Sequence, residues 1–494
     1  MFRFVFGFIL VFVTAGTVSS ADDVVTRATR LFEKRHYEDA AGLLRSEASS
    51  LAPGGQGTAN LLLGMIYFKN AVLHADLYQA STSASQDYLK KLSAAQRTDR
   101  SRFVDLYLGE ALIETKKPGV AAIYLEKFSG NESIEARYRA IARIGLGLCY
   151  HLNNEAPRAA SLWSAIDAAD PEVKAELAAV FSKAGLADKN PVGMAEESLA
   201  EAKRSGKPLS MRLVKNVLAV YARAGFIEKG LDLLKRSDLK AFSYRETLGK
   251  SKTINFYDLS LLNDMAMLYG RASVAALEKA AADPKVKDAA EFHLAQAYAL
   301  FASPEQSART AASFIATAQM PPQYKDRMKV WQGAVLHQKG RIPDAMAVWD
   351  ELSRKQPEDP DVLAEILFTC GRLRTDCPKT ARQGAAVLEA GEGRRFATLN
   401  VAMGRYYLGK LDSARAVAYL EAGRDKSSKN KIESNDPAML VSLADAYFRT
   451  KKFSEALEIY FEMSKQFPEV RQIQEATQGL YAMEHKSAGD VKIN

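Results

Sequence analysis

Residues 147–171, GLCYHLNNEAPRAASLWSAIDAADP, contain a spacing that recurs twice later in the chain. Small, bulky, small, bulky and proline positions fall at Gly147, Tyr150, Ala159, Trp163 and Pro171. The same steps of three, nine, four and eight residues recur in GAVLHQKGRIPDAMAVWDELSRKQP (333–357) and ADAYFRTKKFSEALEIYFEMSKQFP (444–468). Because residues three or four apart share one helix face, the pattern predicts two antiparallel helices joined by a tight turn.

The residue sizes explain how two such helices would pack. Gly147 and Ala159 carry almost no side chain, so the helix backbones can approach, and Tyr150 and Trp163 fill the space one turn away. Prolines suit the first turn of a helix, and we expect several second helices to begin at them: Pro118, Pro304, Pro343 and Pro378.

Weaker copies extend the pattern along the chain. They are ATRLFEKRHYEDAAGLL (28–44), GEALIETKKPGVAAIYL (109–125) and LAVYARAGFIEKGLDLL (218–234). Segments 258–321 and 366–422 fit the spacing only with changed turn lengths. At roughly 34 residues per pair, the length allows on the order of a dozen helix pairs.

The spacing resembles that of the tetratricopeptide repeat family. The resemblance implies an all-α fold, a right-handed α-solenoid of antiparallel helix pairs, over residues 22–486. We expect joints near 52–60, 189–208 and 236–255 and a C-terminal tail at 487–494. An irregular helical bundle is the alternative, which three full matches at identical spacing disfavour.

The N-terminus has the pattern of a cleavable secretory signal peptide. Arg3 precedes an apolar run at residues 4–15, and small residues Ser19 and Ala21 place the cut after residue 21. The run is shorter than the about 20 residues that a membrane-spanning helix needs, and we see no other apolar segment that could span. We therefore expect a periplasmic or secreted protein; an uncleaved membrane anchor is the alternative.

Composition predicts a well-folded chain, with 47% hydrophobic and 26% charged residues. The net charge is +8, and basic residues cluster in expected loops at 90–102, 235–252 and 424–431. These clusters are either solvated surface or docking points for an anionic partner such as lipid headgroups. We expect no nucleic-acid partner, because the signal directs the chain out of the cytoplasm.

The cysteines suggest one disulfide. Cys370 and Cys377 bracket the turn CGRLRTDC, so an oxidising compartment would allow them to pair, and two free thiols are the alternative. Cys149 lies within a predicted helix and is expected to be a buried thiol. No histidine or third cysteine lies nearby, which disfavours a metal site.

No sequence pattern indicates catalysis. The six histidines are isolated, and no HExxH, dinucleotide-binding or phosphate-binding loop is present. We therefore expect no enzymatic activity, no cofactor and no metal.

The resemblance implies a non-catalytic exported scaffold or adaptor for protein partners of a cell-envelope complex. Secretion, polysaccharide export, pilus assembly and outer-membrane assembly are the roles that exported members suggest. A helical superstructure serving a cell-wall enzyme is one alternative, and a helical-repeat RNA-binding protein is another.

The resemblance also suggests where a partner would bind, because the first helix of each pair lines the concave groove in this family. The residue after the bulky position is expected to face that groove, with three acidic residues of one pair beside it. The candidates are Phe32, Phe68, His151, His337, Phe448, Asp105, Glu110 and Glu114. The groove is thus expected to be partly aromatic and locally acidic; packing between helices is the alternative for the aromatic residues.

A partner's terminal carboxylate is not expected to bind as in the family. The family's asparagine clamp lies directly after the small residue of each repeat. This chain has other residues there, namely Glu110, Leu148, Ala334 and Asp445.

We predict that the protein loses its first 21 residues in a secreting host. N-terminal sequencing of the purified mature form should then begin at or near Asp22. Recovery of an intact species beginning at Met1 and embedded in the membrane would contradict this prediction.

Overall fold

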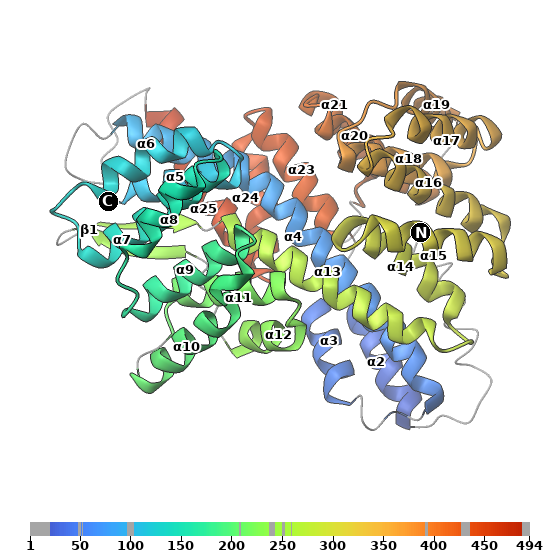
Figure 1. Ribbon diagram of the computed structural model, residues 1–494. Coiled ribbons are helices and arrows are strands. Elements are labelled where there is room, and N and C mark those ends of the chain that lie inside the picture. Colours follow the sequence, from blue (N-terminus) through green and yellow to red (C-terminus); the bar gives the residue numbers. More distant parts are fainter. Residues whose placement is uncertain are drawn as a thin grey trace. The chain divides into compact units, whose positions relative to one another are not determined.

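The computed structural model describes residues 20–47, 51, 53–95, 103–206, 209–236, 243–248, 252–257, 259–390, 394–425 and 435–486. Nearly all of the expected signal peptide and the whole expected tail lie outside these residues. Within them the chain is almost entirely helical, and consecutive helices run antiparallel (Figure 1). The fold is an α-solenoid of helix pairs.

The chain divides into two compact units. Unit 1 comprises Met1–Leu73 and Tyr269–Glu462, and unit 2 comprises His74–Leu268 and Met463–Asn494. Helices α4 (Pro53–Ala95), α13 (Leu259–Ala281) and α24 (Phe453–Ser464) each pass from one unit into the other.

The remaining elements belong to one unit each. Unit 1 contains α2 (Ser20–Glu33), α3 (Tyr37–Ser46), α14 (Lys287–Phe301), α15 (Pro304–Thr317), α16 (Pro322–Gln338), α17 (Ile342–Lys355), α18 (Pro360–Leu373), α19 (Pro378–Ala390), α20 (Arg394–Gly409), α21 (Ser413–Gly423) and α23 (Pro437–Arg449). Unit 2 contains α5 (Val104–Glu114), α6 (Pro118–Ser129), α7 (Ala136–Leu152), α8 (Ala156–Ser164), α9 (Pro171–Lys183), η1 (Ala187–Lys189), α10 (Pro191–Arg204), α11 (Met211–Ala224), α12 (Ile227–Arg236), β1 (Ser243–Leu248), β2 (Lys252–Tyr257), η2 (Pro468–Val470) and α25 (Arg471–Lys486).

A single backbone turn joins the two helices of most pairs. In the pair α7–α8, Asn154 adopts a positive φ of 64°, and the next N–H, that of Glu155, donates to the carbonyl oxygen of Tyr150 at 2.8 Å. This is the bond by which a left-handed residue closes a helix C-terminus. The positive-φ residue lies four positions after the bulky residue of the repeat.

The same turn recurs in both units. Its left-handed residues are Arg35, Lys116, Asn154, Gly185, Gly225, Gly340, Arg374, Leu411 and Lys451. In each turn the following N–H donates to the carbonyl five residues earlier. The turn at Leu411 corrects the expectation for 366–422, because Gly404, Tyr407, Ala416 and Leu420 keep the original steps of three, nine and four.

The interlocking of small and large residues within a pair is confirmed. A Cβ atom added at Gly147 would collide with the indole of Trp163, and one at Gly333 with that of Trp349. The indole nitrogens donate to equivalent backbone carbonyls, Trp163 to Ile144 at 3.1 Å and Trp349 to Val330 at 3.0 Å.

Proline and aspartate fix the helix starts. Helices α6, α15 and α19 begin at Pro118, Pro304 and Pro378, and α17 has Pro343 at its second position, as predicted. Several first helices start with Asp-Pro instead. The Asp170 carboxylate accepts hydrogen bonds from the N–H groups of Glu172 and Val173, which caps α9.

The described residues of the three stretches in which we expect joints include ordered elements. Helix α4 begins at Pro53, inside the glycine-rich run at 52–60, and α10 occupies most of 189–208. In 236–255 the structure has an antiparallel hairpin, in which Tyr244 pairs with Phe256 and Thr247 with Thr253. This hairpin is the one β element among the described residues.

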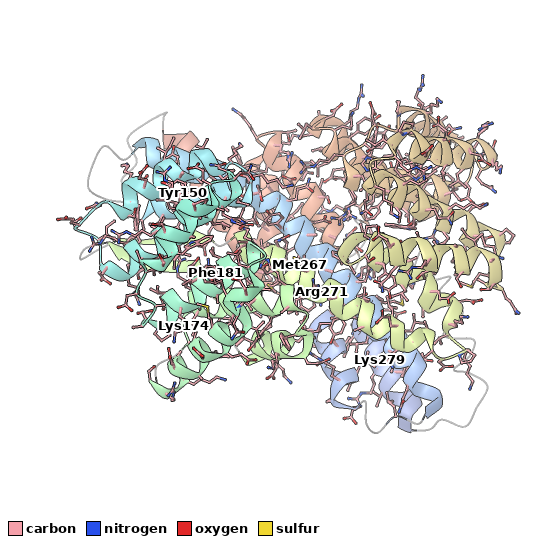
Figure 2. The ribbon with its side chains drawn as sticks, in the orientation of Figure 1. Tyr150, Lys174, Phe181, Met267, Arg271 and Lys279 are labelled. Carbon is pink, nitrogen blue, oxygen red and sulfur yellow. A yellow bond between two sulfur atoms is a disulfide. The ribbon has the colours of Figure 1, made fainter. Side chains whose placement is uncertain are left out.

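Each unit has its own apolar interior, which side chains fill between the helices (Figure 2). In unit 2 the core includes Tyr150 and Phe181, and the Phe181 ring meets Trp163 edge-on with centroids 5.3 Å apart. In unit 1, Trp331 and Trp349 are among the largest fully buried side chains.

We predict that Gly333→Ala destabilises unit 1, because the new methyl group would displace Trp349 and strain its hydrogen bond. The free energy of unfolding should fall by about 1–3 kcal/mol, as measured by urea denaturation. The control is Gly42→Ala in α3, where a Cβ meets nothing within 4 Å. It should raise stability slightly, because alanine favours the helix. Equal stability of the two variants would contradict the prediction.

Candidate functional site

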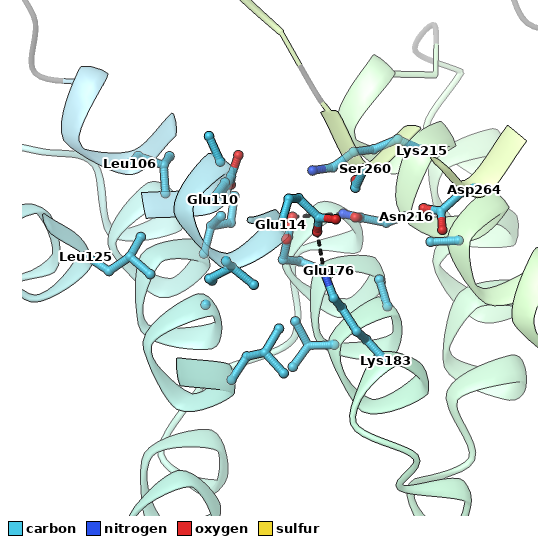
Figure 3. Close-up of a pocket in the computed structure, with 18 of the residues that line it drawn as sticks. Leu106, Glu110, Glu114, Leu125, Glu176, Lys183, Lys215, Asn216, Ser260 and Asp264 are labelled. Atoms are coloured by element: carbon cyan, nitrogen blue, oxygen red, sulfur yellow. Dashed lines mark hydrogen bonds and ion pairs between the residues drawn. The ribbon is translucent and has the colours of Figure 1, made fainter. Parts of the chain in front are cut away.

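Unit 2 contains a groove lined by four first helices, α5, α7, α9 and α11, together with Leu125 of α6 and the start of α13. It encloses about 740 Å³, part of which is open to solvent. Figure 3 shows Leu106 and Leu125 on one side and Lys215 and Asp264 on the other. The groove therefore has an apolar end and a charged end.

Arg212 holds the charged end together. This side chain on α11 is only 3% exposed. Its Nη1 donates to Glu110 of α5 at 2.8 Å and to Glu176 of α9 at 2.9 Å. Asn216 donates its side-chain amide to the same Glu176 oxygen at 2.9 Å. Three helices from three different pairs are thus joined at one guanidinium.

Glu176 is ionised in this setting. Burial raises the pKa of its carboxyl, but the cationic Lys215 and Arg212, with hydrogen bonds from Asn216 and Arg212, outweigh burial and hold that pKa below its ordinary value. A buried carboxylate with this many partners is a fixed part of the groove wall.

The other lining charges are paired as well. Lys183 forms an ion pair with Glu114, and Arg223 Nη1 lies 3.0 Å from Asp264 Oδ1. Burial, together with the carboxylates of Glu114 and Asp264, raises the pKa of the nearby Tyr78 to about 12, so its hydroxyl stays neutral. Four carboxylates and four cations meet here, and their charges balance: Glu110, Glu114, Glu176, Asp264, Lys183, Arg212, Lys215 and Arg223.

Two of the acidic candidates line this groove. Glu110 and Glu114 face it from α5, whereas Asp105 is absent from its lining and pairs with Lys127 of α6 at 2.7 Å. The groove is not acidic as expected, because cations from α9 and α11 neutralise Glu114 and Glu110.

Four of the aromatic and histidine candidates face the second helix of their own pair instead, and Phe68 faces α14. Phe32 is 1% exposed and Phe448 is 8% exposed, so both are core residues, and their rings lie 5.5 Å from Tyr37 and Phe453 respectively. The prediction that they form a binding surface is wrong for these two.

The half-buried candidates also make contacts within the fold. His151 lies 6.1 Å from the Trp163 ring and His337 lies 6.3 Å from that of Trp349. Thr375 is a hydrogen-bond partner of His337. In unit 1, Phe68 meets Phe301 edge-on at 6.1 Å.

Helical periodicity explains this outcome. The chosen position lies four residues after the small residue and therefore shares the face that packs on the second helix. The position one after the small residue lies on a different face, and both Glu110 and Leu148, which occupy it, line the groove.

Most of the charged groove residues were not predicted from the sequence. One of them, Glu176, lies in a short motif that occurs twice in the chain. DPEVKAE (170–176) and DPDVLAE (359–365) each cap a helix with Asp-Pro and end on a glutamate, Glu176 or Glu365, that is buried. Lys215 and Asn216 interrupt an otherwise apolar run, which is a second signal of a buried polar role.

Unit 1 has a matching cluster around Glu365. Its carboxylate accepts from Arg327 at 2.9 Å, from the Trp331 indole at 2.7 Å and from Gln296 at 3.2 Å. His293 lies 3.4 Å from Gln296, and burial lowers the pKa of its imidazole to about 4. His293 is therefore neutral near pH 7.

Cys370 and Cys377 form a disulfide across the turn between α18 and α19, with Cα atoms 6.4 Å apart. Tyr406 of α20 supports this turn through a hydrogen bond to Asp376 at 2.5 Å. Cys149 is buried, and burial raises the pKa of its thiol to about 12, which keeps it protonated.

The described residues contain neither a cluster suited to a metal ion nor a helix suited to span a membrane. No group of three or more histidine, cysteine, aspartate or glutamate side chains there is arranged to hold a metal ion. None of the described helices combines the length and apolar character required to span a membrane. Much of the expected basic surface, including Arg100, Lys250 and Lys429, lies outside the described residues.

Comparison with known proteins gives one family match. Residues 401–469 match the tetratricopeptide repeat model. The match runs from α20 to η2 and so includes the copy at Gly404 and the copy at Ala444. A search of curated protein sequences finds no match to this chain.

Solved structures with similarity to this chain include tetratricopeptide proteins. Yeast Tom70 is 12% identical at a TM-score of 0.33, covering 94% of this chain and 97% of that chain. Cut9–Hcn1 of the APC/C is 13% identical at a TM-score of 0.29, covering 93% of this chain and 96% of that chain. The P58(IPK) TPR domain is 12% identical at a TM-score of 0.21, covering 77% of this chain and 98% of that chain. The α-solenoid fold is evident from the helix pairs described above.

We predict that Arg212→Met destabilises unit 2 strongly, because the buried Glu176 would lose one of its two cationic partners and Glu110 would lose its ion pair. The loss in unfolding free energy should be about 3–5 kcal/mol by urea denaturation. The double variant Arg212→Met/Glu176→Leu should recover much of this loss.

The matched control is Arg158→Met, which removes an exposed arginine that pairs with Glu155 and lies over the Tyr150 ring at the surface. Its stability should be nearly unchanged. A destabilisation of Arg212→Met no larger than that of Arg158→Met would contradict the assigned role of Arg212.

Proposed function

We propose that this protein is an exported, non-catalytic scaffold that holds protein partners in a cell-envelope assembly, and that the groove of unit 2 is a partner-binding surface. The repeat architecture suits protein–protein interaction, since stacked helix pairs present a long continuous surface. The main support for the proposal is the groove that the first helices of unit 2 line.

The groove is preorganised for binding. Arg212 joins α11 to α9 of the preceding pair and also to α5, which lies two pairs further back in the chain. A surface that is already ordered loses less conformational freedom when a partner binds. An apolar hollow beside these ion pairs provides the contact area that a protein segment would bury.

Two features support export. The first is the apolar run at residues 4–15 followed by small residues, which has the form of a cleavable signal. The second is the Cys370–Cys377 disulfide, since such bonds persist in oxidising compartments and are rare in the cytosol. A periplasmic or secreted location is consistent with both.

Photo-crosslinking in the native host tests this proposal. A photoreactive amino acid at Ala179, half-buried in the groove lining, should crosslink a protein partner recovered in the envelope fraction. The control position is Arg158, exposed on α8 and outside the groove. Recovery of the protein in the cytoplasmic fraction would overturn the export part. Crosslinks from Arg158 but none from Ala179 would overturn the groove part.

A further inference from the structure

The apolar end of the groove has an opening above two small residues. Its lining is aliphatic: Leu106, Ala111, Ile113, Leu125, Ile141, Leu148 and Val180. These side chains are almost fully buried, whereas Gly145 of α7 and Ala179 of α9 keep partial exposure. A group entering the groove would therefore reach the aliphatic lining over Gly145 and Ala179.

A side chain at residue 145 would press against the aliphatic lining. A Cβ added there would lie 3.2 Å from Leu125 Cδ1 and 3.9 Å from Ile113 Cδ1. The nearest atom is the far end of a flexible leucine, which can shift by a few tenths of an ångström. A larger residue at 145 would therefore displace Leu125 and change the aliphatic lining of the groove.

The charged end of the groove disfavours binding of a charged side chain from a partner. Glu110, Glu114, Glu176 and Asp264 each already face a cation at ion-pair distance. A guest carboxylate or ammonium would have to displace one of these partners and leave another buried charge uncompensated. Ser260 adds a partly exposed hydroxyl to the same lining, a group that can hydrogen-bond with a peptide backbone.

We propose that this groove binds an uncharged protein segment through one aliphatic side chain, of the leucine or isoleucine type, placed over Gly145 and Ala179. The proposal rests on the proposed function in taking the groove as a partner-binding surface. It adds the chemistry of the partner: the contact is apolar, and neither an acidic nor a basic segment is preferred. Binding is accordingly insensitive to salt, because few ions are released or screened.

A phage-displayed library of random peptides tests this without knowledge of the partner. The purified protein is used as bait at low and at high salt. Enriched peptides should share an aliphatic residue flanked by uncharged residues, and their binding should not weaken at high salt.

Variants locate the contact. Gly145→Leu should reduce binding of the enriched peptides about tenfold or more, the effect of excluding one buried aliphatic side chain. Ala179→Leu should do the same and serves as the second variant if the first disturbs folding, which far-UV circular dichroism checks. The control Gly119→Leu, on an exposed part of α6 where a Cβ meets nothing, should bind as the wild type does.

Several outcomes would overturn the inference. These are enrichment of charged peptides, loss of binding at high salt, undiminished binding to both folded groove variants, or no enrichment. Each leaves the proposed scaffold function open to its own test, because envelope recovery and crosslinking from Ala179 do not depend on the sequence of the peptide.

Discussion

The solenoid depends on one backbone constraint, the left-handed residue that ends the turn inside most of the helix pairs. Glycine fills this position at residues 185, 225 and 340, but Arg35, Lys116, Asn154 and Leu411 also adopt it. Such a conformation costs about 1–2 kcal/mol for a residue with a Cβ. The carbonyl five residues earlier accepts a hydrogen bond in every case, which helps to offset that cost.

The repeat could be predicted from sequence because its signals are local. Gly147 and Trp163 are close in the chain, and their sizes alone indicate how they pack. The copy at Gly404 was overlooked although its spacing is regular. Phe32 and Phe448 are buried because they lie on the same helix face as the small residue of the repeat. The repeat register was predicted correctly, but the helix face that lines the groove was not.

The groove could not be predicted in the same way, because its contacts join distant residues. Arg212 and Glu110 are 102 positions apart, and no local pattern relates them. The shared motif does not settle the pairing either. Glu176 of α9 bonds to an arginine of the following first helix, α11, whereas Glu365 of α18 bonds to Arg327 of the preceding one, α16. Similar local sequences thus support pairing in opposite directions along the solenoid.

The order of the units along the chain has a consequence for how the protein is built. Unit 1 begins with α2, α3 and the first part of α4, but its interior also needs α13, where Ser273 donates to the Gly64 carbonyl at 2.8 Å. The part of α13 that contains Ser273 follows the whole segment His74–Leu268. At about 5–20 residues per second, the N-terminal helices await their partners for on the order of ten to forty seconds of synthesis. Their apolar faces are exposed during that interval, which makes the nascent chain a natural client for a chaperone.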